Sequence, residues 1–585
     1  MSHPTPETSP SLFAGGLLAM ALPVLLAFNL SPSSTVLNQL LAVAGWGALL
    51  WLVPSNGHAL RAARPAAALL GMLALLMAAV VWSWSASLPS SLALSALASL
   101  ACAAVLVAYA QCAAGPDVPD ASDTAEPLWI GLLVAGVLSA VIAVIQVFAP
   151  GWPDGEFIAR SGLVGRAVGN LRQPNHLSTL LLWSLMALVP LAQARRASGL
   201  RLHDAVLATL ATLMVLAVVL TASRTGVLGV LMLGLWGAVD KRLRGRVRIA
   251  LLSAPVVYVI GWALLAAWAH ATQHTFGGEA RLGEADLSSS RFGIWANAWS
   301  LVKAQPWTGV GFGEFNFAWS LTPLPGRPVA FFDHTHNVLL QFLVELGLPL
   351  AALVTGLMLW ALWQALVRSM QATGPNAAGQ RAAFMIVLLA GVHSLLEYPL
   401  WYAYFLLPTA WAWGHALRPA EPDTGSSDSA ASHWPMVAGG LILVGTLFAG
   451  WDYSRVVVIY APGGSALPLA TRIQQGHDSV FYGHHADYAA ATTTEPPAQA
   501  LAAFQTTTHA LLDTRLMIAW ARALADAGRV DEARYLVDRL REFRNPAAAS
   551  FLAECDDAER QPRPFQCEPA SGKGSGNISW RNFTR

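Results

Sequence analysis

The residues of this chain that could bind an anion are a few arginines beside long apolar runs. Arg224, within Ser223-Arg224-Thr225-Gly226, interrupts an otherwise apolar stretch from residue 205 to 240. Arg172 precedes another such stretch, and Arg291 begins a segment with a helical spacing of apolar residues. A guanidinium offers phosphate oxygens a planar fork of donors and keeps its charge. We therefore expect these three arginines to bind a diphosphate-like group.

Histidines before a helix supply the candidate general base. His334-Thr335-His336-Asn337 stands directly before a long apolar run. A neutral imidazole is the usual general base near pH 7, so His336 is the candidate. Glu345 lies about 13 Å further along that helix and on its opposite face, so it is not expected to orient His336. Because a carboxylate inside a membrane is costly, Glu345 needs another partner.

Two further motifs hold polar residues that could contact a substrate. Gln173-Pro174-Asn175-His176 opens an apolar run, with Asn175 as the expected helix N-cap. His393 and Glu397 share a helix face at i, i+4. No histidine spacing is typical of metal ligands, so we expect no metal and no cofactor. We assign substrate binding to Gln173, Asn337, Tyr402 and His334.

The composition places these motifs in a membrane protein. The chain has 585 residues, of which 55% are hydrophobic and 12% charged, whereas a soluble domain carries about 25% charged residues. A net charge of +1 gives no reason to expect nucleic acid as a partner. The stretch 205–240 would be about 54 Å long as one helix, against a hydrocarbon core of about 30 Å. It must therefore fold back, which places Arg224 at a membrane face.

Apolar runs predict an all-α polytopic protein with about thirteen transmembrane helices. The expected spans are 11–30, 36–53, 65–84, 90–113, 128–149, 176–193, 203–222, 225–239, 247–270, 337–366, 382–398, 400–416 and 435–452.

Basic residues orient these spans, since cytoplasmic loops carry an excess of Lys and Arg. Counting spans alternately puts four basic loops on one side, which is therefore predicted to be cytoplasmic. These loops hold Arg61 and Arg64; Arg195, Arg196 and Arg201; Lys241, Arg242, Arg244, Arg246 and Arg248; and Arg368 and Arg381. The candidate site residues then fall on the outer, periplasmic side, together with the tail.

The predicted domains are a membrane core, residues 1–452, and a periplasmic helical region, 453–585. A large outer loop, 271–335, contains an amphipathic helix with apolar residues from Phe292 to Val302, which could lie on the membrane surface. Within the tail, 498–543 resembles a tetratricopeptide-like helix pair, and 569–585 is expected to be disordered.

The chain has four cysteines. Cys102 and Cys112 lie in an apolar segment and are most simply packing residues. If the tail is outside the cytoplasm, Cys555 and Cys567 could form a disulfide, although the sequence does not decide whether they do.

In their order and spacing over residues 160–415, these motifs resemble the O-antigen ligase and protein O-oligosaccharyltransferase superfamily of bacterial inner-membrane enzymes. The family signature is His, then Asn, Ser or Gln, then nine residues, then Gly; here it is His336-Asn337 and Gly347. Arg224 and Arg291 look like the family's two donor-binding arginines. Residues 173–176, residues 397–402 and the long outer tail look most like the protein-glycosylating, PglL-type branch.

The resemblance implies en bloc transfer of an oligosaccharide from an undecaprenyl-diphosphate donor to Ser or Thr hydroxyls of periplasmic proteins such as pilins. Arg224, Arg291 and Arg172 would bind the donor diphosphate, and His336 would take the acceptor proton. Direct attack on the anomeric carbon would invert it, without a metal. The site would lie at the periplasmic face of the inner membrane, among membrane lipids.

Other functions stay open on the sequence alone. An O-antigen ligase acting on lipid A-core and a polysaccharide polymerase would use the same chemistry on other acceptors, because fold and family do not fix the acceptor. A transporter of lipid-linked sugars would place its ionisable residues near the bilayer midplane. The clustering of polar residues at one face favours an enzyme.

Overall fold

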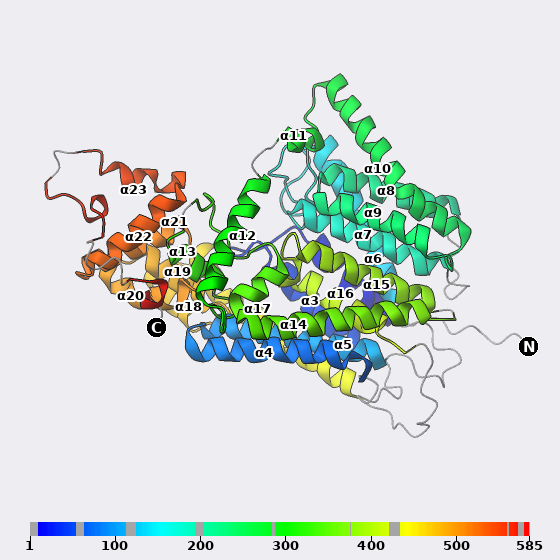
Figure 1. Ribbon diagram of the computed structural model, residues 1–585, viewed down its shortest axis with the longest axis horizontal. Coiled ribbons are helices and arrows are strands. Elements are labelled where there is room, and N and C mark those ends of the chain that lie inside the picture. Colours follow the sequence, from blue (N-terminus) through cyan, green and yellow to red (C-terminus); the bar gives the residue numbers. More distant parts are fainter. Residues whose placement is uncertain are drawn as a thin grey trace, which may run out of the picture. The chain divides into compact units, whose positions relative to one another are not determined.

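Helices make up all the regular secondary structure in the described part of the chain, so the all-α prediction is confirmed there (Figure 1). The computed structural model describes residues 10–53, 64–112, 125–193, 204–283, 287–324, 326–374, 376–419, 433–557, 561–570 and 578–583. The predicted basic loop at Arg195, Arg196 and Arg201 lies outside these residues.

Seven helices in the described residues are long and apolar enough to cross a membrane. They are α4 (Ala67–Ala86), α5 (Ser90–Cys112), α6 (Glu126–Phe148), α7 (Pro174–Gln193), α10 (Gly245–Thr272), α14 (Val338–Gln371) and α17 (Trp434–Tyr460). Four shorter apolar helices are α1 (Pro10–Met20), α3 (Val36–Leu52), α8 (Asp204–Thr221) and α9 (Arg224–Val239). These helices support a multi-pass membrane protein, while the count of thirteen spans stays a prediction.

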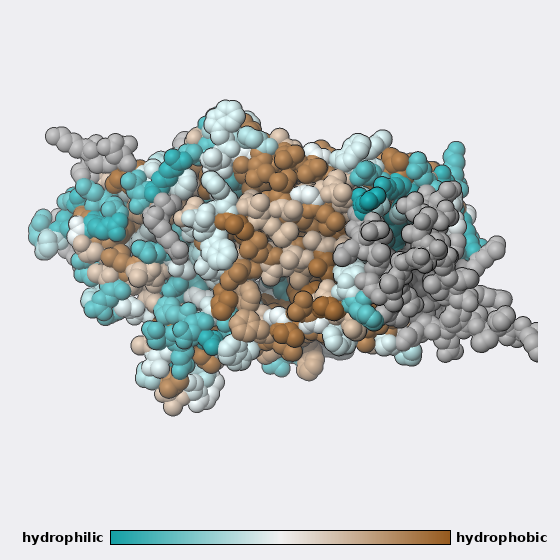
Figure 2. Space-filling view, turned by 90° about the horizontal axis from the view of Figure 1, so that it is seen from below, coloured by the Kyte–Doolittle hydropathy of each residue, from teal (hydrophilic) through white to brown (hydrophobic). Residues whose placement is uncertain are grey.

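Large apolar side chains lie exposed on several of these helices, as expected for surfaces that face lipid. On α14, Leu353, Leu359, Trp360 and Trp363 are each more than half exposed. Figure 2 shows hydrophobic side chains gathered over a broad area of one face. Such an area on a soluble monomer would cause aggregation, whereas a bilayer covers it.

The chain divides into two compact units, and the division falls within α4, α5, α14 and α17 and at residues 285–286. The first unit comprises residues 1–71, 101–285 and 357–448, and the second comprises 72–100, 286–356 and 449–585. The boundary that the sequence suggests at 452–453 stays a prediction.

Helix α7 is the centre of the first unit. It packs against α6, α8, α9 and α15 (Ala377–Ser394), and its residues from Pro174 to Pro190 are buried. Small residues permit this packing, because they let helix backbones approach closely. The Ser184 hydroxyl donates to the Leu132 carbonyl of α6 at 2.6 Å, and a methyl group on Gly136 would lie 2.2 Å from that hydroxyl oxygen.

The long apolar stretch breaks as predicted, into α8 and α9. Ala222 between them has a φ of 49°, a left-handed conformation that a helix interior does not contain. Ser223 then caps α9, accepting a hydrogen bond from the Gly226 N–H at 3.1 Å. The two helices pack against each other, and Arg224 is the first residue of α9.

The second unit has a core shared by the loop region and the tail. Helices α12 (Leu287–Ala304) and α13 (Phe315–Leu321) contribute to one hydrophobic cluster with α20 (Leu501–Thr507), α21 (Thr514–Asp526) and α22 (Val530–Phe543). Helices α21 and α22 pack as a pair, in the segment predicted to resemble a tetratricopeptide unit.

Helix α12 buries one side and exposes part of the predicted apolar stripe. Ile294, Ala298, Leu301 and Val302 are buried, whereas Phe292 and Trp299 are 64% and 48% exposed. Contact of the exposed residues with the membrane surface stays a prediction. The helix carries two apolar stripes, and packing against α13 and the tail selects one of them. The apolar spacing alone could not make that choice.

The end of the tail is partly ordered, and Cys555 is disulfide-bonded to Cys567 with their Cα atoms 5.1 Å apart. Residues Trp580–Phe583 form a 3-10 turn (η6), which departs from the predicted disordered end, and Phe583 packs against Trp520. Residues 571–577 and 584–585 lie outside the described part. Cys102 is half-buried and unbonded to another cysteine.

Candidate functional site

The start of α7 is capped by Gln173 and not by Asn175, so the predicted cap is wrong. The Gln173 Oε1 atom accepts from the His176 N–H at 2.8 Å, while Asn175 lies inside the helix. Gln173 directly precedes Pro174, and its long side chain reaches the backbone N–H of His176 in the first turn of α7. The Asn175 carboxamide is thereby available for tertiary contacts.

A buried chain of hydrogen bonds joins three of the sequence motifs within the first unit. The Ser223 hydroxyl donates to Asn175 Oδ1 at 2.6 Å, and Asn175 Nδ2 donates to Glu397 Oε1 at 3.1 Å. The Ser178 hydroxyl donates to Ser223 Oγ at 3.0 Å. All four residues are buried, so these bonds are shielded from water and define one geometry.

Arg224 projects from this buried chain as an exposed residue. It directly follows the cap Ser223, which Asn175 and Ser178 hold in place. The N-terminus of a helix carries a partial positive charge, which adds to that of the guanidinium. An accessible cation at such a position suits an anionic ligand.

A cavity of about 170 Å³ lies in the same unit and contains three predicted site residues. Its walls include Arg172, Gln173, His176, Glu397, Tyr402 and Tyr404. The rings of Tyr402 and Tyr404 stack with centroids 5.3 Å apart, and the His176 ring lies edge-on to Tyr402 at 4.9 Å. Aromatic faces combined with amide, carboxylate and guanidinium groups form a surface suited to a sugar with many hydroxyls.

Arg172 is held at this cavity by the backbone. It has a φ of 57°, and its guanidinium donates to the carbonyls of Ser34, at 3.2 Å, and of Ala27. These bonds fix the guanidinium plane against the connection before α3. Its proposed contact with a diphosphate stays a prediction.

The second unit positions His336 through its neighbours. The Thr335 N–H donates to Gln341 Oε1 at 2.8 Å, and the Thr335 carbonyl accepts from Trp295 Nε1 at 3.0 Å. His336 itself has a φ of 55°, which turns the chain into α14. Asn337 caps that helix, since its Oδ1 accepts from the N–H groups of residues 339 and 340. This structural role of Asn337 stands beside its predicted role in substrate binding.

Asp333 is a residue that the sequence analysis missed. His334 Nδ1 lies 3.0 Å from its Oδ1. Burial acts to raise the pKa of Asp333, but His334, with a smaller effect of His336, holds it below its ordinary value. A carboxylate beside an imidazole stabilises the protonated ring, as in catalytic triads. Its position directly before His334-Thr335-His336 was the available signal in the sequence.

Arg291 lies on the helix that contacts the His336 segment. It is half-buried and stands one turn before Trp295, whose indole N–H bonds to Thr335. The structure therefore brings Arg291, His334, His336 and Asn337 into one part of the second unit. Arg224, Arg172, Gln173 and Tyr402 belong to the first unit, and one pocket shared by both sets stays a prediction.

Glu345 has the partners that the sequence required. Gln341 Nε2 donates to its Oε1 at 2.9 Å, and the backbone N–H groups of Gly313 and Phe315 also contact it. Gln341 therefore links Thr335 to Glu345. Glu345 acts as an anchor for this segment, and its separation from His336 stays a prediction.

Comparisons with known proteins agree with these motifs. Residues 209–355 match a family described as O-antigen ligase, residues 167–191 match one described as protein glycosylation ligase, and residues 381–551 match the C-terminal part of a virulence factor membrane-bound polymerase family.

Two relatives from Acinetobacter baylyi (strain ATCC 33305 / BD413 / ADP1) are similar to this chain. A general O-oligosaccharyltransferase is 28% identical over 258 residues, which is 43% of each chain. A ComP-specific O-oligosaccharyltransferase is 26% identical over 296 residues, or 49% of this chain and 50% of the relative. The chain thus spans half or less of the length of these relatives.

Proposed function

Because the chain resembles the O-antigen ligase and protein O-oligosaccharyltransferase superfamily, in particular its PglL-type branch, we propose that it glycosylates proteins. It moves an oligosaccharide en bloc from an undecaprenyl-diphosphate donor to Ser or Thr hydroxyls of periplasmic proteins such as pilins. The observation that carries this proposal is the exposed Arg224, which directly follows Ser223 in the buried hydrogen-bonded chain of Ser223, Asn175 and Glu397.

The arginines act on the leaving group. As the bond between the anomeric carbon and the phosphate oxygen breaks, negative charge grows on the diphosphate. Arg224, Arg291 and Arg172 bind that charge, and fixed cations lower the barrier because they need no reorganisation during the reaction. The bidentate guanidinium fork fits two phosphate oxygens at once. We place this site at the periplasmic face of the inner membrane.

His336 acts as the general base. It takes the proton of the acceptor hydroxyl while the hydroxyl oxygen bonds to the anomeric carbon and the undecaprenyl diphosphate leaves. The configuration is inverted in this single displacement, and no metal takes part. Asp333 supports the role, because its carboxylate pairs with His334, two residues before the base, and places negative charge near the imidazolium that forms.

The cavity in the first unit receives a sugar of the donor. Gln173 and Tyr402 offer hydrogen bonds to sugar hydroxyls, and the stacked tyrosine rings offer an apolar face. His334 and Asn337 contact the substrate near the base. The names of the two relatives favour a protein acceptor over lipid A-core.

A polysaccharide polymerase is the second candidate, because residues 381–551 match a polymerase family. It would keep the same donor chemistry and use a glycan hydroxyl as acceptor. An O-antigen ligase would use lipid A-core. A transporter of lipid-linked sugars remains the alternative of another class.

The purified full-length protein, reconstituted with one defined undecaprenyl-diphosphate oligosaccharide, tests these functions. Three acceptors are offered in parallel: a pilin-like protein, lipid A-core and a free glycan. We expect transfer to the protein only, and loss of transfer in His336→Ala. Transfer to another acceptor identifies the ligase or polymerase, and undiminished transfer by His336→Ala refutes the base assignment.

A further inference from the structure

The segment that leads to His336 has no core of its own. Between Glu314 and His336 the only helix in the described residues is the seven-residue α13. All of α13 is buried, and its large side chains pack into one cluster with α21 and α22 of the tail. The Trp319 ring lies 5.4 Å from Phe543, and Tyr535 donates to the Leu321 carbonyl at 2.7 Å.

Asn316 links the tail directly to the approach to His336. Its Oδ1 accepts from the Leu512 N–H of the tail at 2.7 Å, and its Nδ2 donates to the Phe332 carbonyl at 2.9 Å. The Phe332 ring in turn lies edge-on to the His336 ring at 5.5 Å. One buried carboxamide therefore spans from the tail backbone to the residue that contacts the candidate base.

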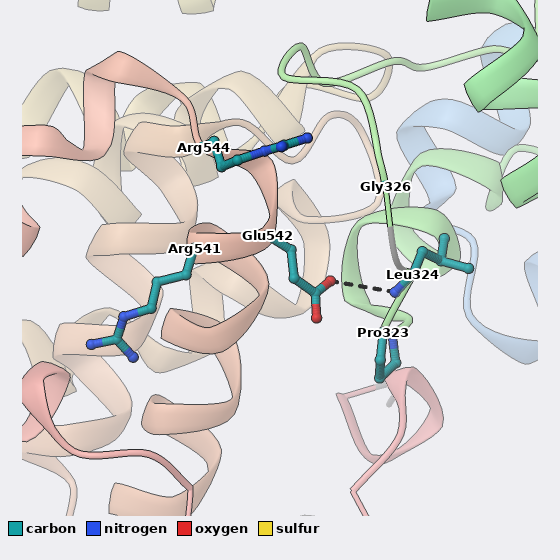
Figure 3. Close-up of a pocket in the computed structure, with 6 residues that line it drawn as sticks. All are labelled: Pro323, Leu324, Gly326, Arg541, Glu542 and Arg544. Carbon is teal, nitrogen blue, oxygen red and sulfur yellow. Dashed lines mark hydrogen bonds between the residues drawn. The ribbon is translucent and has the colours of Figure 1, made fainter.

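A second set of contacts holds the middle of the segment against the C-terminal end of α22. The Arg327 guanidinium pairs with Glu542 at 3.1 Å and lies 4.4 Å over the Phe543 ring. Burial lowers the pKa of Arg327 to about 10, against the opposing effect of Glu542. Glu542 also accepts from the Leu324 N–H, as Figure 3 shows.

The same end of α22 reaches further along the segment. The Phe331 and Phe543 rings stack with centroids 3.8 Å apart. Asn545, just beyond the helix, donates through Nδ2 to the Val329 carbonyl at 3.2 Å. Val329 and Phe331 lie within seven residues of His336, so tail side chains contact several positions of the segment that precedes it.

The start of the segment is anchored as well. His509 of the tail lies 2.6 Å from Glu314 through its Nδ1, and both side chains are buried. The Ser87 hydroxyl donates to the other carboxylate oxygen at 2.8 Å, and the Phe317 ring stacks on His509 at 4.2 Å. The tail thus contacts the start of the segment 314–336 at Glu314, its middle at Leu324 and Arg327, and its later part at Val329 and Phe331.

We infer that the tail helices are the scaffold that positions His336, and that Asn316 and Asn545 are positioning residues for the transfer reaction. The inference rests on the proposed function, in which His336 is the base. A base displaced by about 1 Å can lose about a hundredfold in rate, so a scaffold of this kind controls turnover without contacting the substrate.

Two Asn→Asp substitutions in the full-length protein test the inference. Asn316→Asp keeps the acceptor for Leu512 but loses the donor to Phe332. Asn545→Asp likewise keeps the Oδ1 acceptor for the Ala547 N–H, loses the donor to Val329, and sits at a half-exposed position where misfolding is not expected. The control is Glu532→Gln, which removes only the exposed Arg529–Glu532 ion pair on the first turn of α22.

Backbone hydrogen exchange and transfer kinetics are measured on each variant. Both Asp variants should exchange faster at residues 327–337 but not at 514–526, with kcat about ten- to a hundredfold lower and donor KM within about twofold of wild type. Glu532→Gln should match wild type in both measurements.

Unchanged exchange at 327–337 overturns the inference, as does faster exchange with unchanged kcat. Faster exchange at both 327–337 and 514–526 also overturns the inference, because Asn316 and Asn545 would then support only the overall stability of the protein. Hydrogen exchange is measured without substrate, so it tests the scaffold contacts independently of the transfer reaction. If His336→Ala keeps full transfer, the proposed base is refuted, and the scaffold contacts are then judged on hydrogen exchange alone.

Discussion

At the scale of single residues, Arg224 is defined by its chemistry and by the cap that holds it. Lysine would keep the charge but lose the bidentate fork. Removing one fixed donor from a developing anion costs about 10²–10³ in kcat, so Arg224→Ala should lose that much and Arg224→Lys should fall between. Turnover with a purified lipid-linked donor measures this. Arg160→Lys, in the loop before α7, is the matched control, and wild-type turnover in Arg224→Lys would contradict the diphosphate assignment.

Asp333 gives a second prediction at this scale, in the rate of transfer. The neighbouring histidines, mainly His334, hold the pKa of Asp333 below its ordinary value, so its carboxylate is charged near neutral pH. Asp333→Asn removes this negative charge beside the base and should lower kcat with little change in the KM for the donor. Transfer kinetics with a purified lipid-linked donor measure this. An unchanged kcat would separate Asp333 from the base.

At the scale of elements, Gly347 of the family signature lies on α14 and lets the connection between α12 and α13 pack closely against this helix. Gly347 has a φ of 73°, and a Cβ there would lie 2.5 Å from the Trp307 backbone. Gly347→Ala should destabilise the protein by about 1–3 kcal/mol, because strain and a backbone clash combine. Gly356→Ala, on the same helix with open space around it, is the control. Equal thermal unfolding midpoints for the two variants would exclude the steric role.

At the scale of the whole molecule, the disulfide tests on which side of the membrane the tail lies. Disulfides persist in oxidising compartments, so Cys555–Cys567 fits a periplasmic tail. In cells that carry C102S/C112S, a membrane-impermeant maleimide should label the tail only after an impermeant reductant is added. An additional Cys555→Ser substitution leaves Cys567 unpaired and should allow labelling without reductant. Absence of labelling in both cases would place the tail in the cytoplasm.

The sequence by itself determined the class of the molecule and its motifs. Hydropathy, helical spacing and the break at Ser223-Arg224 are local properties, so the helical membrane class, the break between α8 and α9 and the family resemblance could be predicted. The N-cap of α7 could not, because Gln173 and Asn175 both have suitable side chains and tertiary contacts decided between them.

Only the tertiary structure decided which motifs are neighbours. Asn175 meets Glu397 across 222 residues, and Glu314 meets His509 across 195. It also chose the buried stripe of α12 and joined the tail to the approach to His336. The physical reason is that one sequence can satisfy its local hydrogen-bonding and apolar periodicity in several ways, and only the simultaneous packing of distant segments selects one.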